Sequence, residues 1–509
     1  MTPSVAVLAL LALSLAACGG ERADAGDARP LEIVVPTELG SLDPRFTTRA
    51  LDVKVTRLIH AGLVGLDPET QAPVPLMAAS LTWLGPTQLR VELNRRARFH
   101  SGAPLTPRDV CATLEALADP SLGSPHRVVV AAIGRCQETG EASLELSLRE
   151  PRATLLTDLE VPILRADQTR SSELPRGELD GLGPFRVARF DYTEVSLERA
   201  PSAANHAPRE VVVRTVRDEN ARVLRLLAGR ADIAPSSVSP TLLPALTRGT
   251  TGGQALTVHA RRGANVTYLL FQNDLPPTSQ VTLRHAVAHA IDRQLIVDTL
   301  LAGKAQVASG LFPRGHWSAD PTATPVPYDP AKAREALAGQ ELTLTTSTDR
   351  ARLTIARAIA QMLTDAGARV RLIALDLGVL LKRLDAGDFQ LAVLQMPELT
   401  EPNLLAWFFH PRGVPGEGGA GRNRARYRSP RVGSLLDHAS ATTDVEARRA
   451  AYWEVAHEMA KDLPTLPLWH EDQVAVLSPR AASFQLTAIG RWDALAQPPR
   501  LSSPHPAAR

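Results

Sequence analysis

Apolar and polar positions follow two different periods along the chain. Residues 88–93 alternate between apolar and polar side chains, which is typical of a strand with one buried face. Strand-like runs also occur at residues 31–36, 142–148, 185–190 and 195–197. Apolar residues recur at helical spacing in residues 51–63, 220–228, 282–302, 352–366 and 445–461. Because helices and strands alternate throughout, we predict an α/β or mixed α+β fold.

Residues 98–117 carry the clearest local signal. Gly102 suits a tight bend, Thr106 suits the position before a helix, and Pro107 suits the first helical position. The apolar run that begins at Val110 follows directly. This segment is therefore predicted to be a strand end, a glycine turn and a capped helix.

The first apolar run, residues 5–17, is too short to span a bilayer and ends in small residues. Leu15, Ala16, Ala17 and Cys18 are typical of a lipobox, in which the cysteine thiol receives a diacylglyceryl group. A plain signal peptide with an incidental cysteine is the alternative. We predict a lipoprotein signal peptide in residues 1–17, a flexible tether in residues 18–30, and a periplasmic or cell-surface protein that a lipid anchors to the membrane.

Length and charge narrow the possible classes. The 509 residues exceed the size at which a single core usually keeps growing, so two or more lobes are expected. A formal net charge of +2 gives no overall field that would favour nucleic acid as a partner. Lysine is scarce, which we attribute to coding bias; the lysines are Lys54, Lys304, Lys332, Lys382 and Lys461.

Two cysteines, Cys111 and Cys136, remain besides Cys18. In an oxidising compartment a disulfide between them would close a loop of about 25 residues and contribute about 3 kcal/mol. Two buried free thiols are the alternative.

Several separated segments match the motifs of one family in the same order. Residues 98–110 read RFHSGAPLTPRDV, and the other matching segments are residues 41–44, 59–64, 75–83, 181–187, 229–234 and 283–293. Together they resemble the family 5 extracellular solute-binding proteins, which include the dipeptide-, oligopeptide- and nickel-binding proteins of ABC importers.

The resemblance implies an α/β, two-lobed periplasmic-binding-protein fold of type II, a Venus flytrap with a ligand cleft between its lobes. Lobe I would comprise residues 31–267 plus 473–497, and lobe II residues 268–472, followed by a disordered tail at 498–509. The implied function is capture of a small solute, with a short peptide favoured, by a monomer that delivers it to an ABC permease. A sensor that presents its solute to a membrane receptor is the alternative.

The resemblance also implies candidate ligand contacts. In peptide-binding members, an acidic residue in a loop of the second lobe holds the substrate's α-amino group, and Glu398 stands at the matching position. Its carboxylate would form a charge-assisted hydrogen bond to an ammonium; Glu401 is a second candidate. Because the family's usual Asp and preceding Gly are here Glu398 and Pro397, another amine-bearing ligand stays possible.

Aromatic side chains supply the remaining ligand candidates. Trp317 and Trp407 could wall an apolar pocket, with core packing as the alternative for each. Phe46 and Phe185 stand where the family's first lobe faces its cleft.

Enzyme motifs are incomplete. Residues 416–421 match a dinucleotide fingerprint only in their letters, because no strand precedes them. His457 and Glu458 lack a second histidine at zinc-protease spacing, and no Gly-x-Ser-x-Gly elbow occurs. The arginines of residues 422–431 could attract an anion, although a solvated loop is the simpler interpretation. We therefore expect a binding protein without catalytic residues, metal or cofactor; a hydrolase would need a nucleophile and base that the sequence does not reveal.

Overall fold

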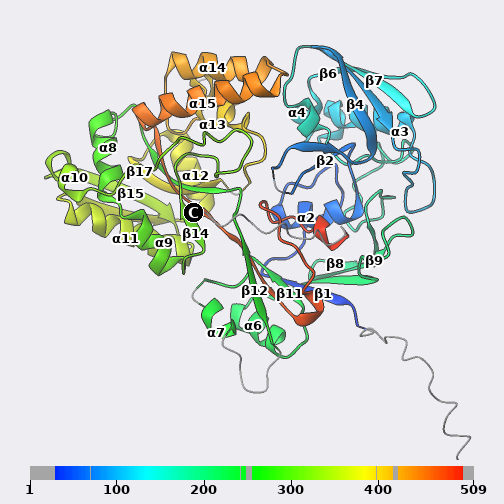
Figure 1. Ribbon diagram of the computed structural model, residues 1–509, viewed down its shortest axis with the longest axis horizontal. Coiled ribbons are helices and arrows are strands. Elements are labelled where there is room, and N and C mark those ends of the chain that lie inside the picture. Colours follow the sequence, from blue (N-terminus) through cyan, green and yellow to red (C-terminus); the bar gives the residue numbers. More distant parts are fainter. Residues whose placement is uncertain are drawn as a thin grey trace, which may run out of the picture. The chain divides into compact units, whose positions relative to one another are not determined.

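Helices and strands alternate along the chain, as the sequence pattern predicts (Figure 1). The computed structural model describes residues 29–68, 70–240, 242–247, 255–396, 398–416 and 422–496. The predicted lipobox with Cys18 and the predicted tail at 498–509 lie outside these residues. Within them, no helix has both the length and the apolar character needed to cross a membrane.

A seven-stranded sheet contains the first strand of the described chain. Its order is β12-β19-β11-β1-β10-β9-β8, and β1 runs parallel to β10 and β11 on its two sides. Every residue of β1 is buried, as expected for a strand in the middle of a covered sheet. The strands are β1 Leu31–Val35, β8 Phe185–Asp191, β9 Glu194–Arg199, β10 Glu210–Thr215, β11 Ile233–Pro235, β12 Thr257–Arg261 and β19 Gln473–Leu477.

A four-stranded antiparallel sheet has the order β4-β5-β7-β6. In β5, Gln88–Leu93, alternate residues are buried, which confirms the predicted strand. The other strands are β4 Ala78–Gly85, β6 Ile133–Glu138 and β7 Ser143–Leu148, and a two-stranded sheet joins β2 Val64–Leu66 to β3 Pro73–Pro75.

The predicted turn and capped helix at residues 98–117 are confirmed. Gly102 has a φ of 89°, and helix α3, Pro107–Ala118, follows Thr106. The backbone N–H of Thr106 donates to the Asp109 carboxylate at 2.9 Å, and its hydroxyl donates to the same oxygen at 2.6 Å. A disulfide joins Cys111 of α3 to Cys136 of β6, so it ties the helix to the edge strand of the four-stranded sheet.

A six-stranded mixed sheet has the order β14-β18-β13-β17-β15-β16. Its central strand β13 is entirely buried, because alternate residues enter apolar cores on opposite faces: Leu269 and Phe271 on one, Tyr268 and Leu270 on the other. Helices α8 to α11 pack on the first face and α12 to α15 on the second. The strands are β13 Val266–Phe271, β14 Ala305–Val307, β15 Glu341–Ser347, β16 Arg369–Leu375, β17 Leu391–Met396 and β18 Thr465–Glu471.

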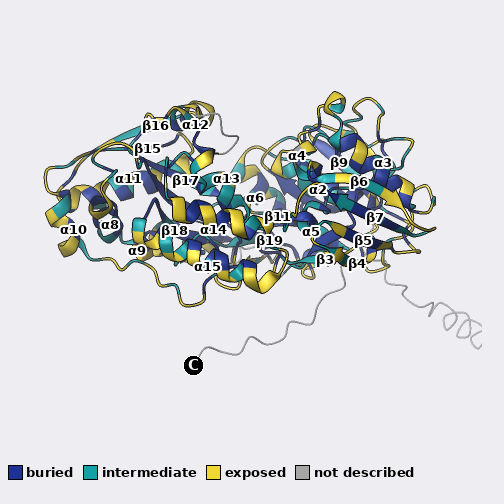
Figure 2. Ribbon diagram, turned by 90° about the horizontal axis from the view of Figure 1, so that it is seen from above, coloured by how far each residue is buried: buried dark blue, intermediate teal, exposed yellow. Residues whose placement is uncertain are grey.

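Many helices carry buried residues on one side and exposed residues on the other, as the colours in Figure 2 show. Besides α3, they are α2 Ala50–Ile59, α4 Arg127–Val130, α5 Leu155–Asp158, α6 Glu219–Leu227, α7 Leu243–Thr247, α8 Val281–Ala290, α9 Arg293–Leu300, α10 Pro330–Leu337, α11 Arg350–Asp365, α12 Leu377–Ala386, α13 Leu404–Phe409, α14 Pro430–Ala441 and α15 Val445–Asp462. Single 3₁₀ turns lie at Pro120–Leu122, Pro411–Gly413, Pro479–Ala481 and Asp493–Leu495.

The single helix predicted over residues 282–302 is wrong, because two helices occupy that segment. Ile291 has an extended backbone and ends α8, and the side chain of Asp292 accepts a hydrogen bond from the backbone N–H of Leu295 at 2.9 Å. This cap begins α9 in a new direction, which an apolar period alone cannot reveal.

The chain passes twice between the seven-stranded and six-stranded sheets, once from β12 to β13 and once from β18 to β19. Asn265 joins the two passages: its amide donates to the Glu471 carbonyl at 2.7 Å and accepts from the Glu471 backbone N–H at 2.9 Å. A Cβ on Gly263 would lie 2.1 Å from that carbonyl oxygen, so only glycine allows this close approach. We call residues 262–265 and 471–473 the crossing.

Candidate functional site

Glu398 lies beside the crossing. It follows β17, and the next residue, Leu399, donates its backbone N–H to the Ala264 carbonyl at 2.8 Å. Ala264 in turn donates to the Ala488 carbonyl at 2.7 Å. Glu398 is partly buried, and its side chain makes no hydrogen bond or ion pair with any residue of the described chain. A carboxylate held in this way is free to bind a cationic group.

Lys54 of α2 faces the same region. Burial lowers the pKa of its ammonium, the negative charge of Glu398 raises it, and the positive charge of Arg57 lowers it. A Cβ on Gly490 would lie 3.1 Å from Lys54 Nζ and 2.7 Å from Gln473 Oε1, so the ammonium lies against the crossing. Glu398 and Lys54 are thus opposite charges within each other's electrostatic field, with no ion pair between them.

Arg57 stands one helical turn after Lys54 and is held by an acidic partner. Its Nη2 donates to Glu160 at 3.0 Å, and Arg491 binds the other oxygen of Glu160. Arg491 also donates to Asp493 at 2.8 Å. Arg57 Nη1 is buried without a hydrogen-bond partner among the described residues. One guanidinium nitrogen is therefore fixed in place with its donors unused.

Glu401, the second acidic candidate, is already paired. Its Oε1 binds Arg448 of α15 at 2.6 Å, and the Thr157 hydroxyl donates to its Oε2 at 3.2 Å. Burial raises the pKa of the Glu401 carboxyl, and Arg448 lowers it. Ala153 joins the same cluster, because its N–H donates to the Ser440 carbonyl at 3.1 Å. Glu401 therefore holds residues 153–157 against α14 and α15.

Trp317 belongs to this Glu401 cluster. The guanidinium carbon of Arg448 lies 5.2 Å from its ring centroid, and the Tyr452 ring meets it edge-on at 6.1 Å. Trp407, on α13, is not part of the Glu401 cluster. It is 44% exposed, and Arg422 Cζ lies 5.7 Å from the centroid of its ring. No contact in the described chain joins either indole to Glu398.

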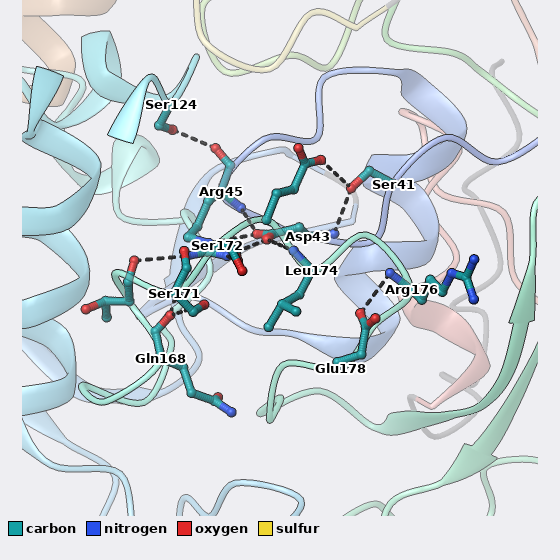
Figure 3. Close-up of polar contacts among 12 residues, drawn as sticks. Ser41, Asp43, Arg45, Ser124, Gln168, Ser171, Ser172, Leu174, Arg176 and Glu178 are labelled. Carbon is teal, nitrogen blue, oxygen red and sulfur yellow. Dashed lines mark hydrogen bonds and ion pairs between the residues drawn. The ribbon is translucent and has the colours of Figure 1, made fainter. Parts of the chain in front are cut away.

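Phe46 lies on a segment fixed by the buried pair Asp43 and Arg45 (Figure 3). Arg45 binds Asp43 at 2.5 Å and donates to a row of backbone carbonyl oxygens in the facing loop, those of Gln168, Thr169, Ser171 and Ser172. The Phe46 ring lies under Arg45 and lines a shallow hollow of about 290 Å³ with Leu122 and Arg170.

Phe185 is fully buried at the start of β8, in the apolar core beneath the seven-stranded sheet. This packing leaves its ring no surface for a ligand in the structure. The glycine-rich turn before Phe185 matches the family motif. The sequence alone could not show whether that motif serves packing or lies near a cleft.

A cavity of about 340 Å³ that is partly open to solvent lies between β18, α15 and the loop before Val326. Its walls are mainly apolar, and among its lining residues Asp320 Oδ2 lies 2.8 Å from His457 Nε2. None of the candidate ligand residues lines it. No group of three or more His, Cys, Asp or Glu side chains within the described ranges has an arrangement that could hold a metal ion.

Sequence reasoning missed Lys54 and Arg57 as site residues. The scarcity of lysine was a usable signal, because Lys54 is one of very few lysines and stands in a helix near the family's opening motif. We attributed that scarcity to coding bias. The link between Glu401 and Arg448 joins residues 47 positions apart and had no sequence signal.

Comparisons with known proteins agree on one family. Residues 72–414 match the model of the bacterial extracellular solute-binding proteins, family 5 Middle. The chain is 24% identical over 385 residues to di/tripeptide-binding protein 1 of Pseudomonas aeruginosa, covering 70% of each chain. It is 25% identical over 509 residues to the peptide transport periplasmic protein SapA of Salmonella typhimurium, covering 89% of each.

Solved structures give the same fold. The ABC transporter substrate-binding protein CtaP of Listeria monocytogenes aligns with a TM-score of 0.81 at 18% identity, covering 92% of this chain and 98% of that one. The α/β architecture is therefore the two-lobed, type II periplasmic-binding-protein fold, as predicted. The chain belongs to the bacterial extracellular solute-binding proteins of family 5.

Proposed function

We propose that this protein captures a short peptide, or another small amine-bearing solute, and that Glu398 binds its ammonium group. The observation that carries the proposal is the Glu398 carboxylate, which is partly buried beside the crossing and has no partner in the described chain. Burying a charge without a partner is costly, so a cationic ligand group would relieve that cost. The peptide-binding relatives support a peptide as the ligand.

The ligand would lie between two lobes. Lobe I would comprise residues 31–267 plus 473–497 and lobe II residues 268–472, which assigns the seven-stranded and six-stranded sheets to different lobes. Closure about the crossing would bury the ligand, and the ligand's contacts with both lobes would favour the closed state. The hydrogen bond from Thr157 to Glu401 would join the lobes in that state.

The name of one relative supports delivery to an ABC permease as the role of this protein. A lipid on Cys18 would hold the monomer at the membrane surface on the periplasmic or outer side. A sensor that presents its solute to a membrane receptor would use the same cleft. In both cases the protein would act by binding alone, not as an enzyme.

The test combines native mass spectrometry with calorimetry on the protein lacking residues 1–30. Di-, tri- and tetra-alanine are compared with their N-acetylated forms, which lack the ammonium. We expect the free-amine peptides to bind, and E398Q to weaken them about 10- to 100-fold, as for loss of a charged hydrogen bond.

The matched control is E335Q, because Glu335 is an exposed glutamate on α10 and its loss should leave affinity unchanged. Equal binding of N-acetylated and free peptides, or full affinity in E398Q, would refute the ammonium site. Absence of binding by every peptide would refute peptide capture.

A further inference from the structure

Lys54 and Arg57 form a cationic pair on one face of α2. They are three residues apart in a helix, a spacing that places side chains next to each other. Burial is the main cause that lowers the pKa of Lys54, the Glu398 charge raises it, and the neighbouring Arg57 charge lowers it further because like charges repel each other. Such an arrangement has a cost, which an anion bound between the two groups would offset.

The donors of both side chains are available. Lys54 Nζ makes no hydrogen bond or ion pair with any residue that the structure describes, although most of the side chain is buried. Arg57 uses Nη2 on Glu160, while Nη1 is buried without a partner in the described ranges. A buried donor without a partner, such as Arg57 Nη1, is rare in folded proteins, because leaving it unsatisfied is costly.

The surrounding residues hold the pair in position. Glu160 binds Arg57 through one carboxylate oxygen and Arg491 through the other, and Arg491 is further fixed by Asp493. The Lys54 ammonium rests against Gly490 and Gln473 at the crossing. These contacts fix the Arg57 guanidinium, and they place the Lys54 ammonium next to Gly490, within the electrostatic field of the unpaired Glu398.

Lys54 could instead serve only as the internal counter-ion of Glu398. In that case the two groups would be expected to form a direct ion pair, and none joins them in the described chain. An internal counter-ion would also give no role to the unused Arg57 Nη1. The separated charges fit a ligand that lies between them better.

We propose that Lys54 Nζ and Arg57 Nη1 bind a carboxylate of the same ligand whose ammonium binds Glu398, so that the protein selects zwitterionic solutes. This inference rests on the proposed function and narrows its substrate class. The carboxylate is the C-terminus of a short peptide or an acidic side chain near the N-terminus, since both offer the same chemistry to a lysine and an arginine.

The test measures affinity for matched peptides with a free or amidated C-terminus, using the di-, tri- and tetra-alanine pairs. We expect wild-type protein to prefer the free acid about 10- to 100-fold, the effect of one charged hydrogen-bonding contact. K54M should bring the acid-to-amide ratio close to one, whereas K54R should keep most of the preference. E398Q should weaken the acid and the amide in parallel.

Two further arms complete the design. Ala-Glu-Ala amide should bind like the amides if the site takes the C-terminus and like the free acids if it takes an acidic side chain. K332M is the matched control, because Lys332 is an exposed lysine on α10, and it should leave the ratio unchanged.

The outcomes separate the two proposals. The carboxylate site would be overturned, with peptide capture left intact, by either of two results. One is that wild-type protein binds the free acids and all the amides with equal affinity; the other is that K54M leaves the acid-to-amide affinity ratio unchanged. Stronger binding of every peptide by K54M would identify Lys54 as an internal counter-ion and also overturn the inference. If no peptide binds wild-type protein, the proposed function fails first.

Discussion

Replacing Arg448 with methionine should strongly destabilise the fold. The Arg448 side chain is 6% exposed and that of its partner Glu401 is 16% exposed, with 2.6 Å between Nη2 and Oε1. In R448M the Glu401 carboxylate stays buried without its cation, and breaking a buried pair from one side costs about 3–5 kcal/mol. R448M should therefore lower the free energy of unfolding by about this amount at pH 7.5.

The double variant R448M/E401L tests the physical cause. It removes both charges of the Glu401–Arg448 pair, so we expect a loss below about 2 kcal/mol, mainly from the aromatic contacts of Arg448 with Trp317 and Tyr452. R431M is the surface control, because Arg431 and Glu454 form an exposed pair that contributes under about 1 kcal/mol.

The pH dependence provides an independent check. Burial raises the pKa of the folded Glu401 carboxyl, and losing Arg448, which lowers it, should raise that pKa further in R448M. The Glu401 carboxyl then holds its proton more tightly in the folded state than in the unfolded state, so the stability that R448M loses relative to wild type is largest at neutral pH. It should shrink as the pH falls through the folded pKa towards the ordinary value of 4.5.

The assay is urea denaturation followed by tryptophan fluorescence, at pH 7.5 and pH 5. The reasoning fails if R448M is as stable as wild type at pH 7.5, or if the double variant is no more stable than R448M.

Three other changes have expected outcomes. C111S/C136S should lose about 3 kcal/mol of stability in urea denaturation, and unchanged stability would show that the disulfide restricts the unfolded chain very little. G263A should lower the melting temperature through a cost of about 1–3 kcal/mol, because its Cβ would meet the Glu471 carbonyl at 2.1 Å, whereas G310A, which has open space, should not. His60 is buried, and neither of its ring nitrogens has a partner in the described part of the chain. Burial lowers its pKa to about 3 from 6.5, so the unfolded state binds the proton more readily and stability falls below pH 6.5. H60F should remove roughly 2 kcal/mol of the stability loss between pH 7.5 and 5, and an unchanged acid sensitivity would exclude His60 as its source.

Periodicity and capping residues predicted the elements whose local sequence pattern is clearest. The alternation in β5 and the Thr106 and Pro107 signals of α3 are local, so the sequence carries them directly. The break between α8 and α9 was missed, because the Asp292 cap interrupts an apolar pattern that continues on both sides.

The candidate site was harder to predict because its groups come from distant segments. The resemblance led to Glu398 through a local motif. Lys54 stands much earlier in the chain and comes within the electrostatic field of Glu398 only through the path of the chain, with Arg57 one helical turn after Lys54. Likewise, the sequence made Glu401 a second candidate for binding the ligand, but its carboxylate is already paired with Arg448, 47 residues later. Phe185 shows the converse, since a motif that identifies a family need not contact its ligand.

The pairing at the crossing brings the two ends of residues 266–471 next to each other, so the lobe proposed for this segment would be removable as one insertion. Arg261, the last residue of β12, lies opposite Gln473, the first residue of β19, in an antiparallel ladder. A two-residue turn such as Asn-Gly could close these strands into a hairpin and leave the seven-stranded sheet continuous without the insertion. The insertion has neighbouring ends as well, because Thr267 lies opposite Trp469. Gene fragments cut at these positions would therefore be the natural units for expressing each half alone or for exchanging it between relatives.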